Sequence, residues 1–593
     1  MFDILKSTAE YKKLKSHLAV TGPAALFGLP PAGRAQMLAL LAAESRRPLL
    51  AVTAGEAEAT RLAADLSTFG LPAAVFPPRD FLLRPIEGAG REYEYRRLAV
   101  LGDLVGERLG AVCVPAEALL QYTMPKEEFC RNTLTLKPGL ELPLTKLEER
   151  LFDAGYHRRG QVEGPGQFSV RGGIVDIWPP EAKSPARCEY WGDEIDTLST
   201  FDVLSQRRDG DLEKLHISPA REVLFGSAPE TAAALRSALA KEKGRRAAAM
   251  EKAMETDLAQ LDAGLVPEAL DKYMGVRYEK PATLLDYFDA PILVLEEPSA
   301  IREAQKATAF RRSEELKGLY EQGVLCPGLD VLYEDMPYLL AAAQKHSSIC
   351  CENFARTLPG LELKEIINAP AHARPPFSGE VASLAEDLEN LTRQGFAVDV
   401  LAGTGRAAAA LAKDLVNKGF RAGTAKDMVA SPGAVAVRTG HTSAGAEYPF
   451  ARYALLTSRR AGESEKKKPA RKKDKNALSS LTDIAPGDYV VHQNHGIGMY
   501  TGVQRLEVQG VVKDYLKLLY DKGDTLYVPV TQLDLLSRYT APGDGEKVKL
   551  AKLGGQEWTR TRRKVKAAAA EMAQELIALY AKRQQARGTA FPP

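Results

Sequence analysis

The chain has 593 residues, of which 45% are hydrophobic and 26% are charged. Because a single hydrophobic core stops growing well below this length, we expect roughly three to five domains of ordinary globular composition. Lys and Arg number 79 against 77 Asp and Glu, so the whole chain lacks the positive charge typical of a nucleic-acid-binding protein, and any contact with DNA must be local.

The cysteines and the hydropathy pattern indicate a cytoplasmic protein. None of the six cysteines has zinc-ligand or disulfide-framework spacing, which favours reduced thiols. The N-terminal residues MFDILKSTAEYKKLKSHL lack the apolar core of a signal peptide, and no apolar run has the length of a membrane span.

The first part of the chain alternates apolar strands with amphipathic helices, which predicts an α/β domain with a parallel sheet. Residues 1–126 hold expected strands at 48–53, 73–76 and 111–114 and a helix at 56–69. Residues 290–295 (APILVL) resemble a further strand of this domain. We therefore expect the domain to resume over residues 214–345, with residues 127–213 inserted into it.

The inserted residues 127–213 have a different pattern of short strands and tight turns. Expected strands flank Gly172-Gly173 and Gly192-Asp193, which predicts antiparallel hairpins and an α+β insertion. After the resumed domain, residues 346–458 predict a second small α/β domain. In it, a strand at 396–401 runs into Gly403-Thr404-Gly405 and a helix at 407–418.

The last third of the chain begins with a change in composition. Residues 459–475 hold nine basic and three acidic side chains and almost nothing apolar, so we expect a flexible linker over 459–479 rather than a nucleic-acid patch. Residues 480–545 alternate in strand fashion between Gly-rich turns and predict a small β-barrel. Within residues 546–593, apolar residues at helical spacing predict a long helix over 558–585.

Residues 28–35 (GLPPAGRA) have the spacing of a phosphate-binding P-loop, from Gly28 to Gly33 and two following positions. Those positions should hold Lys and Ser or Thr, but here they hold Arg34 and Ala35. The missing hydroxyl removes a Mg²⁺ ligand, and Pro30 and Pro31 lack the backbone N–H groups that would hold phosphate. We therefore interpret this as a degenerate, non-functional P-loop, with no catalytic residue and no cofactor in the chain.

Two motif sets carry a resemblance to a known family. Residues 166–179 (GQFSVRGGIVDIWP) and 189–196 (EYWGDEID) resemble the UvrA-binding domain of the repair protein UvrB. Residues 487–500 (GDYVVHQNHGIGMY), with 514–516 (DYL) and 526–530 (LYVPV), resemble the RNA-polymerase-interacting domain shared with CarD-type regulators, a small Tudor/CarD-like barrel. Both sets in this order resemble the front portion of bacterial transcription-repair coupling factors.

The resemblance implies partners and site residues. UvrA would dock on the inserted domain at the positions of Arg171, Arg187 and Trp191, and the RNA polymerase β subunit would bind the barrel edge at the position of Leu506. The family's ATP- and Mg²⁺-dependent DNA motor and its C-terminal domain, through which most DNA contact would occur, have no counterpart here, so we expect a fragment.

Other interpretations remain open at this point. Trp191 and Leu506 could be core residues. His492 and His495 form an H-x-x-H pattern, but strand spacing predicts opposite faces and structural roles, and we predict no metal site. The whole chain could instead be a UvrB-like damage-verifying ATPase or a CarD-type transcription regulator.

Overall fold

The computed structural model describes residues 2–84, 91–203, 205–354, 358–377, 381–458, 486–492, 495–508, 511–529, 536–539 and 550–552. The chain divides into two compact units, Met1–Gly462 and Glu463–Pro593. Within the described ranges, no helix combines the length and the apolar character needed to span a membrane.

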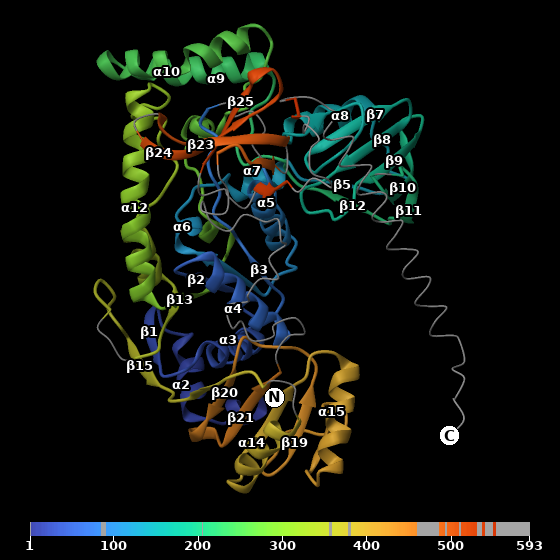
Figure 1. Cartoon of the computed structure of the whole chain (residues 1–593), viewed down its shortest axis with the longest axis vertical. Helices are drawn as coiled ribbons and strands as arrows, with labels where there is room; N and C mark the ends of the chain where they lie inside the picture. The colour runs from blue at the N-terminus through green and yellow to red at the C-terminus, as the bar shows by residue number, and fades with distance from the viewer. Residues whose placement is uncertain are drawn as a thin grey trace. The chain divides into compact units, whose positions relative to one another are not determined.

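A seven-stranded parallel sheet forms the centre of the first α/β domain, in the order β15-β1-β14-β13-β2-β4-β3 (Figure 1). The inner strands are buried along their whole length, because helices cover both faces of a parallel sheet of this kind. The strands are β1 Gly22–Phe27, β2 Leu49–Thr53, β3 Ala73–Val75, β4 Ala111–Pro115, β13 Ile292–Glu296, β14 Ser347–Glu352 and β15 Glu365–Asn368.

The helices of this domain lie before and between its strands along the chain, and the expected helix at 56–69 is present as α4. They are α1 Asp3–Lys6, α2 Ala9–His17, α3 Pro31–Ser45, α4 Glu56–Thr68, α5 Glu92–Val105, α6 Ala116–Leu119, α7 Lys126–Arg131, α9 Ala228–Lys241, α10 Gly244–Asp262, α11 Met274–Arg277, α12 Pro298–Glu321 and α13 Met336–Lys345. Short 3-10 turns lie at Asp271–Tyr273 and Leu284–Tyr287.

The first α/β domain extends further along the chain than we predicted. Strands β14 and β15 fall in the range 346–458, which we assigned to the second α/β domain, yet both pair with β1 of the first sheet. Our boundary at residue 346 is therefore wrong. The reason is that the local sequence of β14 and β15 does not specify which sheet they join, and only their pairing decides it.

The insertion forms an antiparallel sheet in the order β11-β10-β9-β8-β7-β6, in which only β6 and β7 pair in parallel. The two expected hairpins are present, because β7 pairs with β8 around Gly172-Gly173 and β9 with β10 around Gly192-Asp193. The elements are β5 Leu134–Leu136, α8 Leu144–Asp153, β6 His157–Arg158, β7 Gln167–Arg171, β8 Ile174–Trp178, β9 Ala186–Trp191, β10 Glu194–Phe201, β11 Arg208–Asp211 and β12 Leu215–Ile217. Because β12 pairs with β5, the insertion ends after our predicted boundary at 213.

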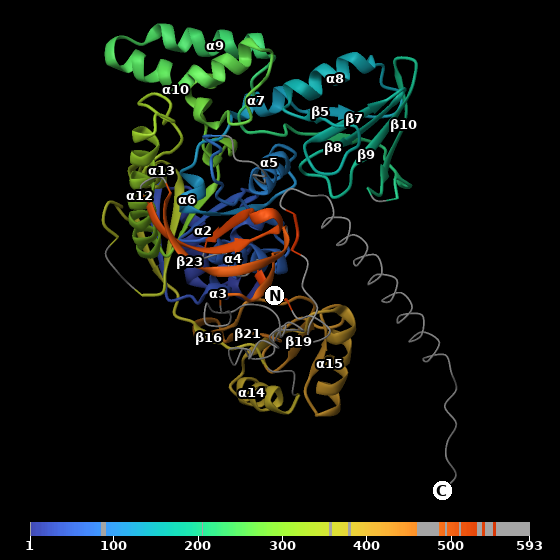
Figure 2. The same cartoon turned by 45° about the horizontal axis from the view of Figure 1, so that its top comes forward.

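The second α/β domain has a six-stranded sheet in the order β16-β20-β21-β17-β19-β18 (Figure 2). The expected strand, Gly-rich turn and helix are present as β17 and α15. The elements are β16 His372–Arg374, α14 Val381–Arg393, β17 Ala397–Leu401, α15 Gly405–Asn417, β18 Ala422–Thr424, β19 Val435–Arg438, β20 Gly445–Tyr448, a 3-10 turn at Pro449–Ala451 and β21 Tyr453–Thr457.

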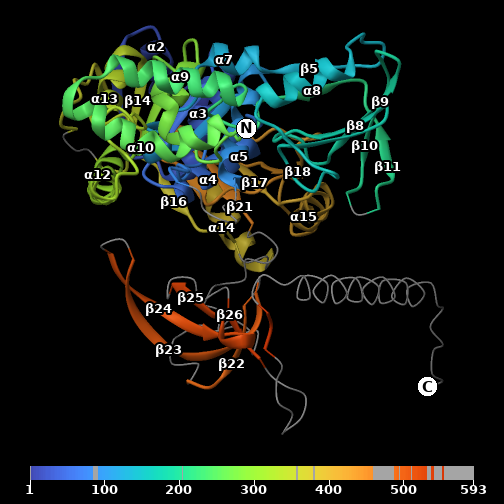
Figure 3. The ribbon, with the colours of Figure 1, turned by 90° about the horizontal axis from the view of Figure 1, so that it is seen from above.

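The second unit contains a five-stranded antiparallel sheet in the order β25-β24-β23-β22-β26 (Figure 3). Its elements are β22 Tyr489–His492, β23 Gly496–Val508, β24 Val511–Leu519, a 3-10 turn at Asp521–Gly523, β25 Thr525–Pro529 and β26 Leu536–Arg538. In the described part of this unit β25 and β26 are both edge strands, so the pairing does not close the barrel that we predicted. The predicted linker at 459–479 and helix at 558–585 lie outside the described residues.

A buried network of charges joins the chain on either side of the insertion. Glu222, which follows the insertion, accepts hydrogen bonds from Nε (2.7 Å) and Nη2 (3.1 Å) of Arg97 on α5. Arg79 contacts Glu222 at 3.2 Å and Asp271 at 2.9 Å. These side chains are almost completely inaccessible to solvent, so each charge depends on its partners for the interactions that water would otherwise provide.

We expect Glu222→Gln to lower the free energy of unfolding by about 3 to 5 kcal/mol, because it leaves two buried guanidinium groups short of one negative charge. Urea denaturation followed by circular dichroism measures the change. Asp262→Asn is the matched control, since it breaks the exposed pair with Arg236 and should cost at most about 1 kcal/mol. Equal effects of the two variants would contradict the role assigned to this network.

Candidate functional site

The degenerate P-loop lies between β1 and α3, where a nucleotide would bind in an active domain. Gly28 has a φ of 87° and ends β1, and Pro31 is the first residue of α3. Helix α3 is buried on all sides from Ala32 to Ala42, as its almost uninterrupted apolar sequence requires. A loop in this position can bind phosphate only if its backbone N–H groups and its basic residue remain free.

Arg34 is not free. Its Nη1 contacts Glu296 Oε1 at 2.6 Å, and its Nη2 contacts Glu297 Oε1 at 2.6 Å. Its Nε donates to the carbonyl of Leu29, and Nη2 also donates to Asn353. Although burial alone would lower it, the pKa of Arg34 is raised above its ordinary value by the negative charge of Glu296, with Glu297 adding to the effect. The guanidinium therefore stays charged and is bound within the protein.

The backbone at Glu297 is adapted to this contact. Glu297 has a φ of 56°, in the left-handed region that costs a non-glycine residue about 1 kcal/mol or more. Its carboxylate reaches Arg34 from this conformation, so the ion pair offsets the strain. Glu296 and Glu297 follow an apolar strand and could have been recognised in the sequence as acidic residues at a strand end, but we assigned them no role.

Other chain segments close the mouth of the loop. A Cβ atom on Gly28 would lie 3.1 Å from Cα of Pro370, and one on Gly33 would lie 3.1 Å from Oη of Tyr448. Ala371 donates its N–H to the carbonyl of Gly28, and the hydroxyl of Tyr448 donates to Gln36 on α3 at 2.7 Å. The loop that would bind phosphate has become a packing surface for the second α/β domain.

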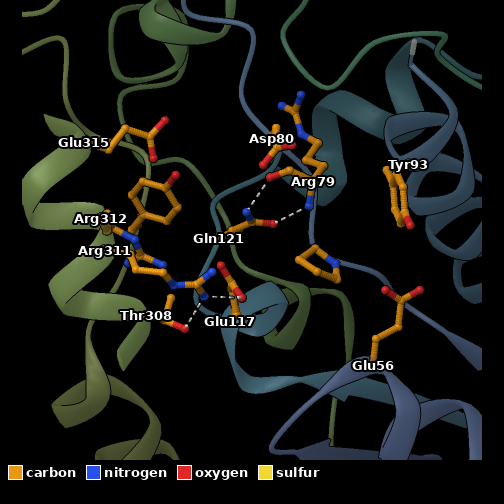
Figure 4. A pocket seen from close by; sticks show the side chains of 12 residues that line it. Glu56, Arg79, Asp80, Tyr93, Glu117, Gln121, Thr308, Arg311, Arg312 and Glu315 are labelled. Atoms are coloured by element: carbon orange, nitrogen blue, oxygen red, sulfur yellow. Dashed lines mark hydrogen bonds and ion pairs between the residues drawn. The ribbon is translucent and has the colours of Figure 1, made fainter. Parts of the chain in front are cut away.

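A pocket of about 400 Å³ lies after the carboxyl ends of β2 and β4, where open α/β sheets commonly bind ligands. Figure 4 shows that side chains of both charges line it. Arg311 contacts Thr308 at 3.2 Å and Glu117 at 3.9 Å, and the guanidinium of Arg312 lies 3.4 Å from the ring centre of Tyr333. Arg311 thus has a partner within the protein and Arg312 stacks on Tyr333, although Nη2 of Arg312 lacks a hydrogen-bond partner. We assign this pocket no ligand.

On the inserted domain, one carboxylate holds two of the predicted site residues. Asp176 on β8 is 1% exposed and contacts Arg171 at 2.5 Å and Arg187 at 2.7 Å. Arg187 also lies over the ring of Phe201, 4.5 Å from its centre. The hydrogen bond to Asp176 raises the pKa of Arg187. We did not identify Asp176 from the sequence, although an acidic residue within the apolar strand IVDIW is an unusual feature.

Trp191 lies at the end of β9 and is 84% exposed, so the alternative that it packs in the core is wrong. Cys188 is buried and Tyr190 packs against the domain core. Strand alternation therefore places Arg187 and Trp191 on the opposite, outward face, as predicted. An exposed Trp near positioned Arg groups has the composition of a protein-binding surface.

Leu506 lies in the second half of β23, opposite Lys513 of β24. Its side chain lies outside the described part of the structure. Strand β22 pairs with β23 only over Gly496–Met499, so residues 501–508 have β24 on one side and no strand on the other among the described residues. An edge of this kind can accept a strand from a partner.

The two histidines of the H-x-x-H pattern lie closer together than predicted. The ring centres of His492 and His495 are 4.7 Å apart, so the prediction of opposite faces is wrong. The reason is that β22 ends at His492 and the next strand, β23 from Gly496, pairs with it in the antiparallel direction. Burial, and the neighbouring His495, lower the pKa of His492 to about 4. The described residues contain no cluster of three or more possible metal ligands.

Comparison with known proteins identifies both motif-bearing regions. Residues 134–223 match the model of the UvrB interaction domain, and residues 484–540 match the CarD-like/TRCF RID domain. Among curated proteins, the chain is 30% identical over 582 residues to a transcription-repair-coupling factor of Bacillus subtilis and 28% identical over 578 residues to one of Staphylococcus aureus. These alignments cover 96% and 95% of this chain but 49% of each relative.

The chain thus spans about half the length of the curated relatives that it matches. The two domain matches have the order that the sequence motifs predicted, and the similarity extends through the α/β domains between and around them. Residues 134–223 are therefore similar to the UvrB interaction domain and residues 484–540 to the CarD-like/TRCF RID domain, and almost the whole chain is similar to part of the transcription-repair-coupling factors.

Proposed function

We propose that this chain is an adaptor in transcription-coupled DNA repair, which binds RNA polymerase through its CarD-like/TRCF RID domain and recruits UvrA through its inserted domain. The observation that carries the proposal is the presence of both domains in one chain related to transcription-repair-coupling factors. Two binding surfaces in one chain bring their partners together at a high effective concentration.

For UvrA, we assign the face of the inserted domain that carries Arg171, Arg187 and Trp191. Trp191 offers apolar area to a partner, and Asp176 fixes the directions of both arginines before binding. Because a side chain held in position loses less entropy on binding, such residues contribute strongly to affinity. Asp176 therefore acts in the proposal as a positioning residue and not as a contact.

For RNA polymerase, we assign the half of β23 that is paired only with β24. We propose Leu506 as the contacting side chain and the polymerase β subunit as the partner. The support is the edge of β23 opposite β24, where residues 501–508 have no neighbouring strand among the described residues. Strand addition needs N–H and C=O groups without a partner.

We assign no ATPase activity and no cofactor to the α/β domain that contains the P-loop. Arg34 fills the position where phosphate would bind, and Glu296 and Glu297 already neutralise its charge. This arrangement argues against a UvrB-like ATPase at this loop. The ATP-driven movement on DNA that the resemblance implies for coupling factors would belong to a separate motor.

Replacing Trp191 by Ala should weaken UvrA binding by about 2 kcal/mol, roughly thirtyfold, without lowering the melting temperature, because the ring contacts the partner and not the core. Asp176→Asn should also weaken binding, since it releases both arginines. Isothermal titration calorimetry with purified UvrA measures both effects. The control is Phe310→Ala, which removes an exposed ring from α12. A similar loss of UvrA affinity in this variant would contradict the assignment of the UvrA site to the inserted domain.

Leu506→Arg should abolish binding to the isolated polymerase β subunit, because a charge placed in an apolar contact is costly to desolvate. Biolayer interferometry measures binding, and thermal melting reports whether the sheet remains folded. Val503→Arg changes an exposed residue of the same strand, and it should retain binding. If Leu506→Arg unfolds the domain, Leu506 is a core residue and the assignment is wrong.

MgATP at 1 mM should leave the melting temperature unchanged. A site with a dissociation constant of about 0.1 mM would instead stabilise the fold by about 1.4 kcal/mol, which thermal melting would detect. Arg34→Ala should lower stability by about 3 to 5 kcal/mol by leaving Glu296 unpaired. ATP turnover by the wild-type chain that disappears in Arg34→Ala would contradict the assignment.

A further inference from the structure

Arg221 is a buried cation without a carboxylate partner. It follows β12, where the chain returns from the insertion to the first α/β domain, and it is 8% exposed. Its neighbours Arg79, Arg91 and Arg97 each form an ion pair with a glutamate, but Arg221 forms none with any carboxylate of the described residues. Its Nε has no hydrogen-bond partner. A buried guanidinium in this state costs stability unless an anion reaches it.

The one side chain that accepts a hydrogen bond from Arg221 does not supply that negative charge. Nη2 of Arg221 contacts Nε2 of His157, which can accept only when the imidazole is neutral. Burial, and then the charge of Arg221, lower the pKa of His157 to about 4, so the ring is uncharged at neutral pH. His157 therefore fixes the direction of the guanidinium without supplying negative charge, and the carboxylates of Glu94 and Asp271 act on Arg221 only from beyond ion-pair distance.

Arg221 lines a cleft of about 880 Å³ between the inserted domain and the first α/β domain. Beside it, within the inserted domain, Ala220 donates its N–H to the carbonyl of Ala154 and Tyr156 donates its hydroxyl to that of Ser218. Arg159 also lines the cleft, and its side chain forms no ion pair with the described residues. The walls are partly apolar, with Phe152, Phe225 and Val266 among them.

The rim of the cleft decides between the possible anions. Glu149, Asp153 and Glu230 also line it, and burial together with the charges of Glu230 and Glu149 raises the pKa of Asp153. Glu268 lines the cleft as well, so four carboxylates outnumber Arg159 and Arg221. A second negative charge on a ligand therefore adds more repulsion than attraction, which disfavours a doubly charged phosphate relative to a singly charged carboxylate. A ligand with one negative charge and an apolar body fits both the rim and the walls.

We propose that this cleft binds a carboxylate group attached to an apolar body, such as an acidic side chain beside an aromatic or aliphatic residue in a peptide partner. Arg221 and Arg159 hold the carboxylate, and Phe152 and Phe225 contact the apolar body. Because the cleft is formed by both domains, an occupant would also hold the inserted domain against the first α/β domain. The inference does not depend on the UvrA or polymerase assignments.

The test uses ligand-observed ¹⁹F NMR of the full chain with 3-(4-fluorophenyl)propionate as the probe. The uncharged 3-(4-fluorophenyl)propionamide has the same body without the carboxylate. We expect the acid to bind and the amide not to bind, and we expect Arg221→Gln and Arg159→Gln to lower the affinity by about tenfold or more. Arg158→Gln is the matched control, because Arg158 lines the same cleft but pairs with Glu148 at 3.0 Å; it should retain binding.

Stability provides a second measurement that separates binding from a structural role. Because Arg221 forms no ion pair within the described residues, removing its buried charge should leave the melting temperature of Arg221→Gln equal to that of the wild type or higher. A melting temperature lowered by several degrees would show that the protein already compensates Arg221 and would overturn the proposal. So would equal binding of the acid and the amide, full binding by Arg221→Gln, or displacement of the acid by an equal concentration of inorganic phosphate.

Discussion

The ion pairs of Arg34 with Glu296 and Glu297 join parts of the first α/β domain that lie far apart in the chain. They connect α3, near the N-terminus, to the end of β13, beyond the whole insertion. Because carboxylates inside the protein pair with the charged guanidinium, helix α3 can be buried on all sides. It can then pack against Tyr448 and Tyr453 of the second α/β domain. The same position in an active P-loop would have to remain open to nucleotide.

Buried arginines are used in different ways in this molecule, and the partner of each decides which. Arg34 and Arg97 face carboxylates and hold segments together. Arg187 faces Asp176 near the surface of the inserted domain, so its partner positions it without hiding it completely. Arg221 contacts a neutral histidine and forms no ion pair with a carboxylate of the described residues. A buried charge without an ion-pair partner is costly to stability, so Arg221, unlike Arg34 and Arg97, does not hold two chain segments together through an ion pair.

The inserted domain is connected to its host by a narrow pair of strands, β5 and β12. The antiparallel sheet of the insertion is separate from the parallel sheet of the first α/β domain, and its outward face carries Trp191. The cleft at Arg221 lies beside that connection, so the host could influence the orientation of the docking face through whatever occupies the cleft. The sheets of the insertion and of the first α/β domain do not share a strand.

The sequence by itself determined the elements whose cause is local. Apolar runs predicted four parallel strands of the first sheet, which are β2, β3, β4 and β13. Gly172-Gly173 and Gly192-Asp193 predicted the hairpins, and the motifs at 166–179 and 487–500 predicted both matched domains. Only the tertiary structure decided that β14 and β15 join the first sheet, that His492 and His495 lie together, that Asp176 holds two arginines and that Arg34 fills its own loop. These features depend on contacts between residues distant in the chain, and residue spacing does not specify which segments will meet.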